Sequence, residues 1–265
     1  MQLIDTMATH QSIQRANAIL REFTELEPAL TVSEISRRLD LHKSTVSRIL
    51  GTLLEDGMVW HNTETGRYSP GMALVEMAGV ALGQIDVRAA AMPHMGRLAT
   101  EINETISVAV PRGREAVTVA HLPSTHSIRH VLWIGRRLPL RTTATGKALL
   151  TAMNARGEPW VDLAGMDDED RPPNWRSALE ADLSLITKLG YADESDEFEV
   201  GTAATAAPIL DHTGTVVAAL AISGPSARFD PDTRKAAAPM LIRTANSISA
   251  ELGMHRLVDL TNSIQ

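Results

Sequence analysis

Apolar residues in the first part of the chain recur at helical spacing. In residues 42–53, four of them fall at i, i+3, i+4 and i+7: Val46, Ile49, Leu50 and Leu53. This spacing places the four side chains on one face of a helix. Similar spacing predicts an earlier helix over residues 12–26 and a short helix that begins after Thr31 and stops near Asp40.

The short helix begins with the segment TVSE, residues 31–34. This pattern is typical of a capping box, in which the Thr31 hydroxyl accepts from a helix N–H and the Glu34 side chain reaches back to the cap. The next helix follows within a few residues, so the two helices must cross steeply. Such a pair is a helix-turn-helix.

A β-hairpin is predicted directly after these helices, in the segment EDGMVWHNTETGRYSPG. Gly57 ends the preceding helix. MVW then reads as a strand, NTETGR as a turn around Gly66, and YSP as the returning strand. A hairpin in this position is a wing, and Arg67 near its tip is placed to reach a DNA backbone or minor groove.

The outer face of the helix over residues 42–53 carries short hydroxyls and cations in place of the usual long Glu and Lys side chains. Short hydroxyls let a helix backbone approach the major groove closely, and Arg and Lys reach guanine edges or phosphates. We therefore expect double-stranded DNA as a partner, contacted by Arg38, Lys43, Ser44, Thr45, Ser47, Arg48 and Arg67.

Beyond the hairpin, the chain changes character twice. Residues 71–85 are apolar on nearly every side, which predicts a linker helix buried against another subunit or a second domain. A helix with Pro93 in its middle follows, where we expect a kink or a break. Strands are then predicted over 105–110, 116–122, 130–134 and 215–223, and helices over 146–155, 177–189 and 231–253.

The predicted fold class is therefore α+β, with an N-terminal winged helix-turn-helix and a C-terminal α/β domain of about five or six strands, joined by a linker helix. The predicted boundaries are 10–70 for the first domain, 71–85 for the linker helix and 86–255 for the second domain.

Composition and charge add limits to this prediction. The 265 residues carry a net charge of −7, and residues 1–70 hold seven Lys and Arg against nine Asp and Glu. This balance disfavours long-range attraction to DNA, although the cations cluster locally between Ser33 and Leu50. The chain has no cysteine, no basic-then-apolar leader and no run of ~18 apolar residues. We expect a cytoplasmic protein without membrane contact that joins the nucleoid when it binds DNA.

A candidate ligand site lies in the segment GRRLPLRTTATGKALLTAM, residues 135–153. Thr143, Ala144, Thr145 and Gly146 stand where a polar loop enters an apolar helix, and free N–H groups there suit a carboxylate or another anion. The segment is not a nucleotide P-loop, because Arg141 and Ala148 occupy positions that require glycine and a hydroxyl residue. A plain helix cap without a ligand is the alternative.

The segment from residue 194 to 225 offers a second half of the site. Small residues around Ala204 leave space, Ser223 ends a strand, and Glu194 and Glu197 lie in a preceding acidic loop. Together with the helix start, they would form a pocket for a small organic acid. Tight packing of sheet on helix is the alternative.

Three stretches carry a resemblance to a known family: LTVSEISRRLDLHKSTVSRILGTLLEDGMV, GRRLPLRTTATGKALL and GTAATAAPILDHTGTVVAALAISGP. In this order and spacing, the chain from about Ile13 to Gly253 resembles the IclR family of bacterial transcription regulators. The resemblance implies a winged helix-turn-helix, a linker helix and a GAF-like effector-binding domain. It also implies a homodimer through the N-terminal domains, and often a homotetramer.

Mapped onto this chain, the resemblance implies effector contacts at Ala144, Thr145, Gly146, Glu194 or Glu197, Ala204, Ala221 and Ser223, with His130 lining the same cavity. Relatives often have polar groups where Ala204 and Ala221 stand, so a roomier and less polar pocket is expected here. Such a pocket disfavours a very small keto acid.

The sequence thus predicts a DNA-binding regulator without enzymatic activity, metal or cofactor, whose affinity for a pseudo-palindromic operator depends on a small effector such as a carboxylate or aromatic catabolite. Family habit favours a repressor. Two alternatives stay open. The C-terminal domain could be an enzyme acting on a small acid, with Ser223 and His130 as its only candidate pair, or a dimerisation module with a filled interior.

Overall fold

The computed structural model of the protein describes residues 2–24, 26–83, 86–155 and 175–254. The chain divides into two compact units, Met1–Gln84 and Ile85–Gln265, and each is described by itself. Within the described ranges, no helix is both long and apolar enough to cross a membrane.

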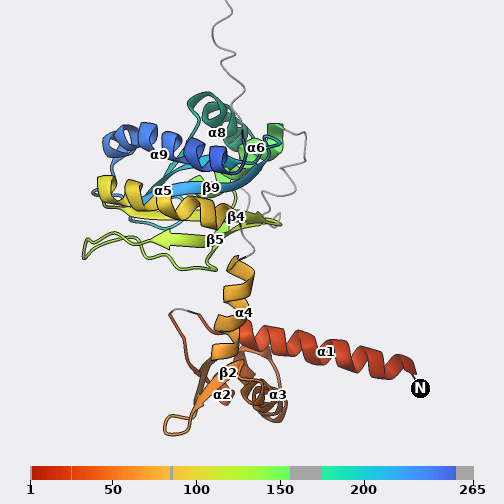
Figure 1. The fold of residues 1–265 in the computed structure, drawn as a ribbon. Coiled ribbons are helices and arrows are strands. Elements are labelled where there is room, and N and C mark those ends of the chain that lie inside the picture. Colours follow the sequence, from red (N-terminus) through yellow and green to blue (C-terminus); the bar gives the residue numbers. More distant parts are fainter. Residues whose placement is uncertain (1, 25, 84–85, 156–174, 255–265) are drawn as a thin grey trace, which may run out of the picture. The chain divides into compact units, whose positions relative to one another are not determined.

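The first unit combines helices with a small antiparallel sheet of order β1-β3-β2 (Figure 1). Its elements are α1 (Gln2–Arg21), β1 (Leu30–Thr31), α2 (Val32–Leu39), α3 (Lys43–Glu55), β2 (Val59–Asn62), β3 (Arg67–Pro70) and α4 (Met72–Gly83). The core consists of aliphatic side chains from the first three helices and the sheet: Ile19, Leu30, Ile35, Val46, Leu50, Leu53 and Val59. The predicted helix-turn-helix with its wing is confirmed.

The capping box at the start of α2 is also confirmed. The Thr31 N–H donates to Glu34 Oε2 at 2.7 Å, and the Glu34 N–H donates to Thr31 Oγ1 at 3.3 Å. At the other end, Asp40 takes a left-handed conformation with φ of 50° and ends the helix. The short connection to α3 follows from this sharp stop.

The helix predicted over residues 12–26 ends earlier, at Arg21. Thr24 closes a turn with Glu27 instead, because the Thr24 N–H donates to the Glu27 carbonyl and the Glu27 N–H donates to the Thr24 hydroxyl. Such local bonds compete with helical ones. The two-residue strand β1, which pairs with Arg67 and Tyr68 of β3, is absent from the sequence prediction.

The second unit contains one six-stranded antiparallel sheet of order β6-β5-β4-β9-β8-β7. Its helices are α5 (Asp86–Ile102), α6 (Ala144–Ala155), α8 (Trp175–Leu189) and α9 (Pro231–Glu251). Its strands are β4 (Thr105–Arg112), β5 (Glu115–Leu122), β6 (Arg137–Pro139), β7 (Ala192–Ser195), β8 (Thr202–Leu210) and β9 (Val216–Pro225). The predicted α/β organisation with about six strands is confirmed.

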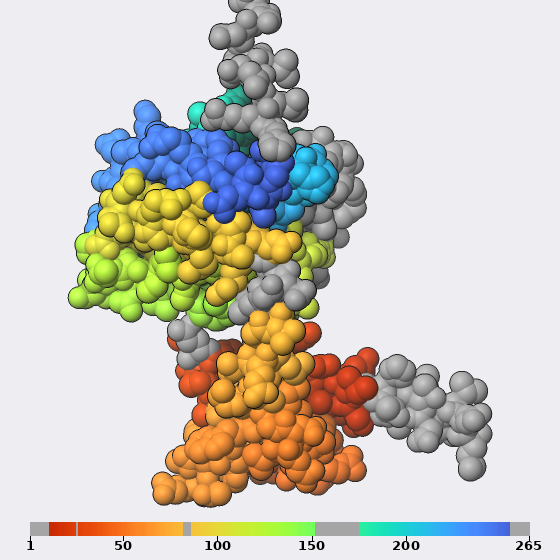
Figure 2. All heavy atoms as spheres, in the orientation of Figure 1, coloured from red at the N-terminus to blue at the C-terminus, as the bar shows by residue number. Residues whose placement is uncertain are grey.

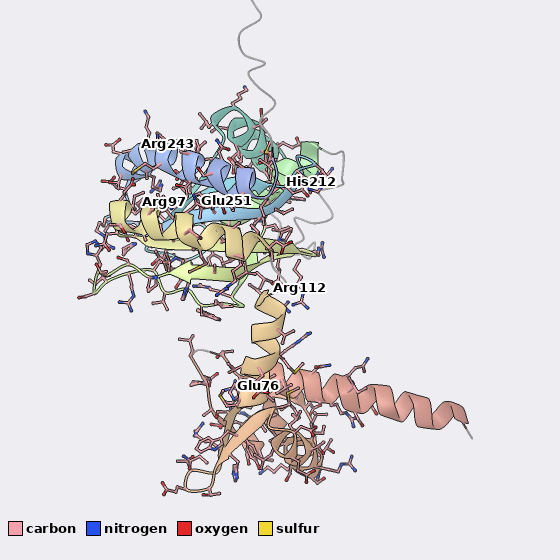
Figure 3. The ribbon with its side chains drawn as sticks, viewed as in Figure 1. Glu76, Arg97, Arg112, His212, Arg243 and Glu251 are labelled. Atoms are coloured by element: carbon pink, nitrogen blue, oxygen red, sulfur yellow. The ribbon has the colours of Figure 1, made fainter. Side chains whose placement is uncertain are left out.

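Helices α5 and α9 lie side by side across one face of this sheet (Figure 2). They are joined by His94 Nε2 of α5 and Glu251 Oε1 of α9, which lie 2.6 Å apart. Charged side chains, among them Arg97 and Arg243, cover the outer surface of this helix pair (Figure 3). The pair therefore presents an apolar side to the sheet and a charged side to solvent.

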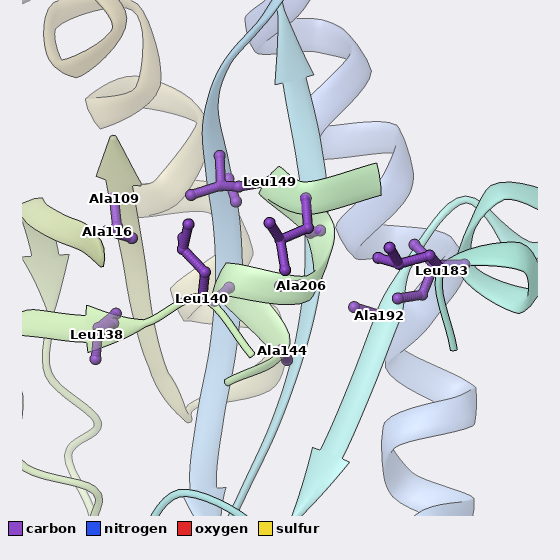
Figure 4. Packing of buried hydrophobic residues seen from close by; sticks show 14 of the residues in the cluster. Ala109, Ala116, Leu138, Leu140, Ala144, Leu149, Leu183, Ala192 and Ala206 are labelled. Atoms are coloured by element: carbon purple, nitrogen blue, oxygen red, sulfur yellow. The ribbon is translucent and has the colours of Figure 1, made fainter. Parts of the chain in front are cut away.

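Helices α6 and α8 pack on the opposite face (Figure 4). The strands present mainly alanines to these helices: Ala109, Ala116, Ala192, Ala206, Ala219 and Ala221. Larger side chains from the helices, such as Leu149 and Leu183, fill the space above them. Small strand residues thus let α6 approach the sheet closely, which places the start of α6 over β8 and β9.

One predicted strand of this unit is wrong. Residues 130–134 form a loop, because side chains bond its carbonyls: the Thr105 hydroxyl donates to the His130 carbonyl, and Arg136 donates to the Val131 carbonyl. Of the kink or break expected at Pro93, the break is absent, because helix α5 is continuous from Asp86 to Ile102. The Ala89 carbonyl four residues earlier, which loses its helical donor, belongs to an exposed residue and is accessible to water.

We expect Gly146→Ala to destabilise the protein, because a Cβ at this position would lie 2.3 Å from the backbone of Leu140. Overpacking of this kind costs about 2 kcal/mol. Gly96→Ala in α5 is the matched control, since a Cβ there meets nothing within 4 Å. This control should raise stability by about 1 kcal/mol, because alanine favours helix over glycine. Thermal unfolding measures both variants, and equal melting temperatures would contradict the close approach of α6.

Candidate functional site

The exposed face of α3 carries most of the side chains predicted to contact DNA. Val46, Leu50 and Leu53 are buried against the core. Four of the predicted residues on this helix are exposed and one, Thr45, is half-buried; the exposed ones are Lys43, Ser44, Ser47 and Arg48. The helix therefore separates an aliphatic face from one of short hydroxyls and cations, as its spacing predicts.

His42 caps α3, a role that the sequence prediction missed. The Ser44 N–H donates to His42 Nδ1 at 3.3 Å, and Ser44 Oγ lies 2.7 Å from the same nitrogen. Because Nδ1 accepts, the neutral ring carries its hydrogen on Nε2. The Ser44 hydroxyl donates inward to the ring, which leaves its oxygen only as an acceptor toward any partner.

The cations of this region fall into two groups. Lys43 and Arg48 have no acidic partner among the described residues. Arg38, in contrast, donates to Glu27 at 2.6 Å and lies 3.8 Å from Glu22. Of these three cations, Lys43 and Arg48 can therefore bind a phosphate without breaking an ion pair, whereas Arg38 cannot.

Arg67 is likewise engaged within the unit. Its guanidinium donates to the Ala29 carbonyl at 2.7 Å and to both oxygens of Glu34 at 3.2 Å. The pKa of the Glu34 carboxyl lies below its usual range. The main cause is the hydrogen bonds from Thr31, and the charge of Arg67 adds to their effect. The guanidinium of Arg67 therefore has a structural role beside the capping box.

In the second unit, one cavity gathers eight of the ten residues predicted to bind an effector. These are His130, Thr143, Ala144, Thr145, Glu194, Ala204, Ala221 and Ser223. The N–H groups of Ala144 and Thr145 lie in the first turn of α6 and have no acceptor within the helix. The predicted helix start and the predicted strand residues therefore face the same space.

The cavity is much smaller than the paired alanines suggest. Its volume is about 20 Å³, which holds roughly one water molecule. Three larger apolar residues that the sequence prediction did not include also line it, namely Phe198, Leu132 and Leu138. The expectation of a roomy pocket is wrong for this conformation, and an organic ligand must displace part of the lining.

Ser107 also lines the cavity and was missed. It pairs with Ala221 across β4 and β9, and strand alternation places it on the same face as Ala109. This period of two was the signal in the sequence that could have identified it.

Glu194 is the acidic group of the cavity, and it lies on strand β7, not in the predicted acidic loop. Its residue is 6% exposed, and its Oε2 is buried without a hydrogen-bond partner among the described residues. Burial first, and then the charge of Glu197, raise the pKa of the Glu194 carboxyl to about 7. Near neutral pH, this carboxyl is therefore close to half protonated.

Glu197 does not line the cavity, which corrects the sequence prediction. Both of its carboxylate oxygens accept from Lys147 Nζ at 2.8 Å. Lys147 also lies 2.9 Å from Asp182 of α8. Burial disfavours the charged amine, but the hydrogen bonds to the two carboxylates outweigh it and raise the pKa of Lys147. Gly146 is also absent from the lining, because it is packed against Leu140.

His130 and Ser223, the pair considered for catalysis, do meet. His130 Nδ1 lies 2.9 Å from Ser223 Oγ, and Arg136 donates to His130 Nε2 at 3.3 Å. An arginine only donates, so Nε2 accepts and the neutral ring carries its hydrogen on Nδ1. Burial, and then the charge of Arg136, lower the pKa of His130 to about 4. The imidazole thus donates to Ser223 and is a weak base.

Arg136 closes the loop that covers this cavity. It donates to Glu199 at 3.0 Å and to the Val131 carbonyl at 2.7 Å. Its guanidinium also lies 4.8 Å from the centre of the Trp133 ring and 5.3 Å from that of Phe198. One side chain therefore links the loop after β5 to the loop after β7. The described residues include no cluster of His, Asp or Glu suited to a metal ion.

Comparison with known proteins gives two family matches. Residues 12–62 match the IclR helix-turn-helix domain, and residues 79–250 match the C-terminal domain of the bacterial transcriptional regulator IclR. The chain is 32% identical over 246 residues to the HTH-type transcriptional repressor AllR of Escherichia coli (strain K12), covering 92% of this chain and 91% of that protein.

Solved structures give the same picture. The Thermotoga maritima IclR matches with a TM-score of 0.72 and 26% identity, covering 94% of this chain and 99% of that chain. An IclR homologue from Microbacterium hydrocarbonoxydans, complexed with 4-hydroxybenzoate, matches with a TM-score of 0.75 and 25% identity, covering 91% and 98%.

The buried amine of Lys147 generates an asymmetric prediction. Replacing both partners, as Asp182→Asn with Glu197→Gln, leaves a buried charge unpaired and should lower the free energy of unfolding by about 3 kcal/mol. Lys147→Met should cost much less, because both carboxylates are partly exposed, at 46% and 42% of their side chains, and water can solvate them. Urea unfolding measures the difference. If Lys147→Met were the more damaging change, the amine would not depend on its partners.

Proposed function

The chain belongs to the IclR family of bacterial transcriptional regulators, and we propose that it is a repressor whose affinity for a pseudo-palindromic operator is set by a small organic acid in the C-terminal cavity. Two observations carry this proposal: the free cationic face of α3 in one unit, and in the other unit a small cavity at the start of α6 that contains hydrogen-bond donors. Effector binding would favour one arrangement of the wings over another, which is a coupling free energy between two sites.

The proposed operator contacts come from α3. Lys43 and Arg48 reach bases or phosphates, Ser47 and Thr45 let the helix lie deep in the major groove, and Ser44 accepts a hydrogen bond. Arg38 and Arg67 contact DNA only if their ion pairs with Glu27 and Glu34 break, so they contribute less to operator affinity.

A homodimer is part of the proposal. Helix α4 exposes large apolar side chains that a second copy would cover: Met72, Val75, Met77 and Val80. Their exposed fractions, from 58% for Met77 to 70% for Val80, are high for such residues. A two-fold dimer in turn requires half-sites separated by a whole number of helical turns. Association of dimers into a tetramer extends the same proposal.

The proposed effector is a carboxylate. Its proposed binding site is the start of α6, where the N–H groups of Ala144 and Thr145 and the hydroxyl of Thr145 are donors. The homologue that holds 4-hydroxybenzoate supports an aromatic acid. We propose binding without turnover, because His130 donates to Ser223 and therefore does not draw a proton from it.

Arg48→Ala should weaken operator binding about tenfold or more, because a phosphate or base contact is lost. The slope of log affinity against log salt concentration should decrease by about one per site. The probe is a DNA fragment selected by binding to the full-length protein. Lys188→Ala, which removes the same charge from α8, is the matched control and should leave the affinity unchanged. Equal binding by Arg48→Ala and wild type would contradict the assignment of α3.

A thermal-shift panel of small carboxylates and aromatic acids tests the effector half. An acid that occupies the cavity should raise the melting temperature, since it binds only the folded state, and should change operator affinity. An acid that raises the melting temperature without altering DNA binding would contradict a sensor function. A panel without any stabilising acid would favour the dimerisation module.

A further inference from the structure

The cavity contains a carboxyl oxygen that no group of the described chain satisfies. Glu194 Oε2 is buried within a residue that is 6% exposed, and it has no hydrogen-bond partner. The backbone N–H groups of Glu197 and Phe198 favour the charged form of this carboxyl. Glu194 lines the cavity, so a ligand there can supply the missing hydrogen-bond partner.

Several other polar groups of the cavity can donate hydrogen bonds to a ligand. The first-turn N–H groups of α6 are donors without an acceptor in the helix. Ser223 accepts from His130 Nδ1, so its own hydroxyl hydrogen is available to a ligand. These donors fit an anionic ligand, whereas an ionised Glu194 on the same wall would repel it.

The cations that adjoin this cavity in the described chain are already paired or neutral, so none of them is free to pair with a bound anion. On α6, Lys147 is already paired with Glu197 and with Asp182 of α8. In the covering loop, His130 is neutral, and Arg136 behind it is paired with Glu199. The neighbouring strands β8 and β9 contribute Ala204, Ala221 and Ser223, which carry no charge.

We propose that Glu194 enters the effector complex as a neutral carboxylic acid that donates a hydrogen bond to the ligand, so that binding of a carboxylate takes up one proton from solvent. This inference rests on the proposed effector function of the cavity. Two carboxylates confined in one small site do not both ionise, and the proton stays on the group that burial already favours in its neutral form.

The pH dependence follows from the position of this equilibrium. The pKa of Glu194 in the free protein is about 7 and rises further when an anion binds. The affinity for a carboxylate ligand therefore has its full value below pH 7. Above pH 7 it decreases by about tenfold for each pH unit. Between pH 6 and pH 8, the dissociation constant of a carboxylate should increase about tenfold.

Isothermal titration calorimetry of the full-length protein tests this, with 4-hydroxybenzoate and each acid that stabilises the protein in the panel as probes. The dissociation constant is measured at pH 6 and pH 8. At pH 8, two buffers of different ionisation heat give the number of protons bound. The wild type should take up close to one proton. Glu194→Gln, an uncharged variant of nearly equal shape, should take up none and should bind with the same affinity at both pH values.

The uncharged 4-hydroxybenzamide is the control on the ligand side, and its affinity should not fall between pH 6 and pH 8. Carboxylate binding that takes up no proton in the wild type would overturn the inference while leaving the sensor function intact. The same proton uptake in Glu194→Gln would also overturn it, since another group would then be responsible. Absence of binding by every acid at pH 6 would overturn both the inference and the proposed function.

Discussion

The candidate site of the second unit depends on a buried charge, the ammonium group of Lys147. It lies on α6, and its two partners, Glu197 and Asp182, come from the loop after β7 and from α8. A buried amine is tolerated only with such partners, so three segments far apart in the sequence are held at fixed distances. This fixes the start of α6 over the sheet and turns the chain after β7 so that Glu194 faces the cavity. The ion pair thus builds the site without taking part in it.

The ion pairs of Lys147 with Glu197 and Asp182 also explain which parts of the site could be predicted from the sequence. Thr31 and Glu34 form a capping box because the two residues are three apart, and such local bonds can be inferred directly. Which of two nearby acids faces a ligand depends on a partner fifty residues away in the chain. Glu194 and Glu197 therefore looked equivalent in the sequence, and only the fold separates the structural acid from the cavity acid. Arg67 illustrates the same limit, since its partner Glu34 is 33 residues away.

The wrong strand at residues 130–134 has a related cause. Its β-branched and aromatic residues have strand propensity, but propensity describes a half-buried pleated surface. Here the carbonyls of His130 and Val131 are taken by the side chains of Thr105 and Arg136, so the segment becomes a loop that covers the cavity. Functional loops of this kind break the local rules because distant side chains satisfy their backbone. The alanine strands, in contrast, were recognised as a place for a cavity, although their small residues could not reveal that the cavity is small or that Phe198 lines it.

A closed cavity is consistent with a sensor, because a ligand shifts an equilibrium only through a difference in affinity between two states. A ligand larger than water must displace Phe198 or the covering loop, and Arg136 joins these two elements through Glu199 and through both aromatic rings. Opening the cavity would therefore require breaking mainly the contacts of Arg136, while Lys147 holds the start of α6 in place. In the proposed sensor, the start of α6 would recognise the anion, and the covering elements would respond to its binding. The loops after β5 and β7 would then be the elements whose two arrangements the effector distinguishes.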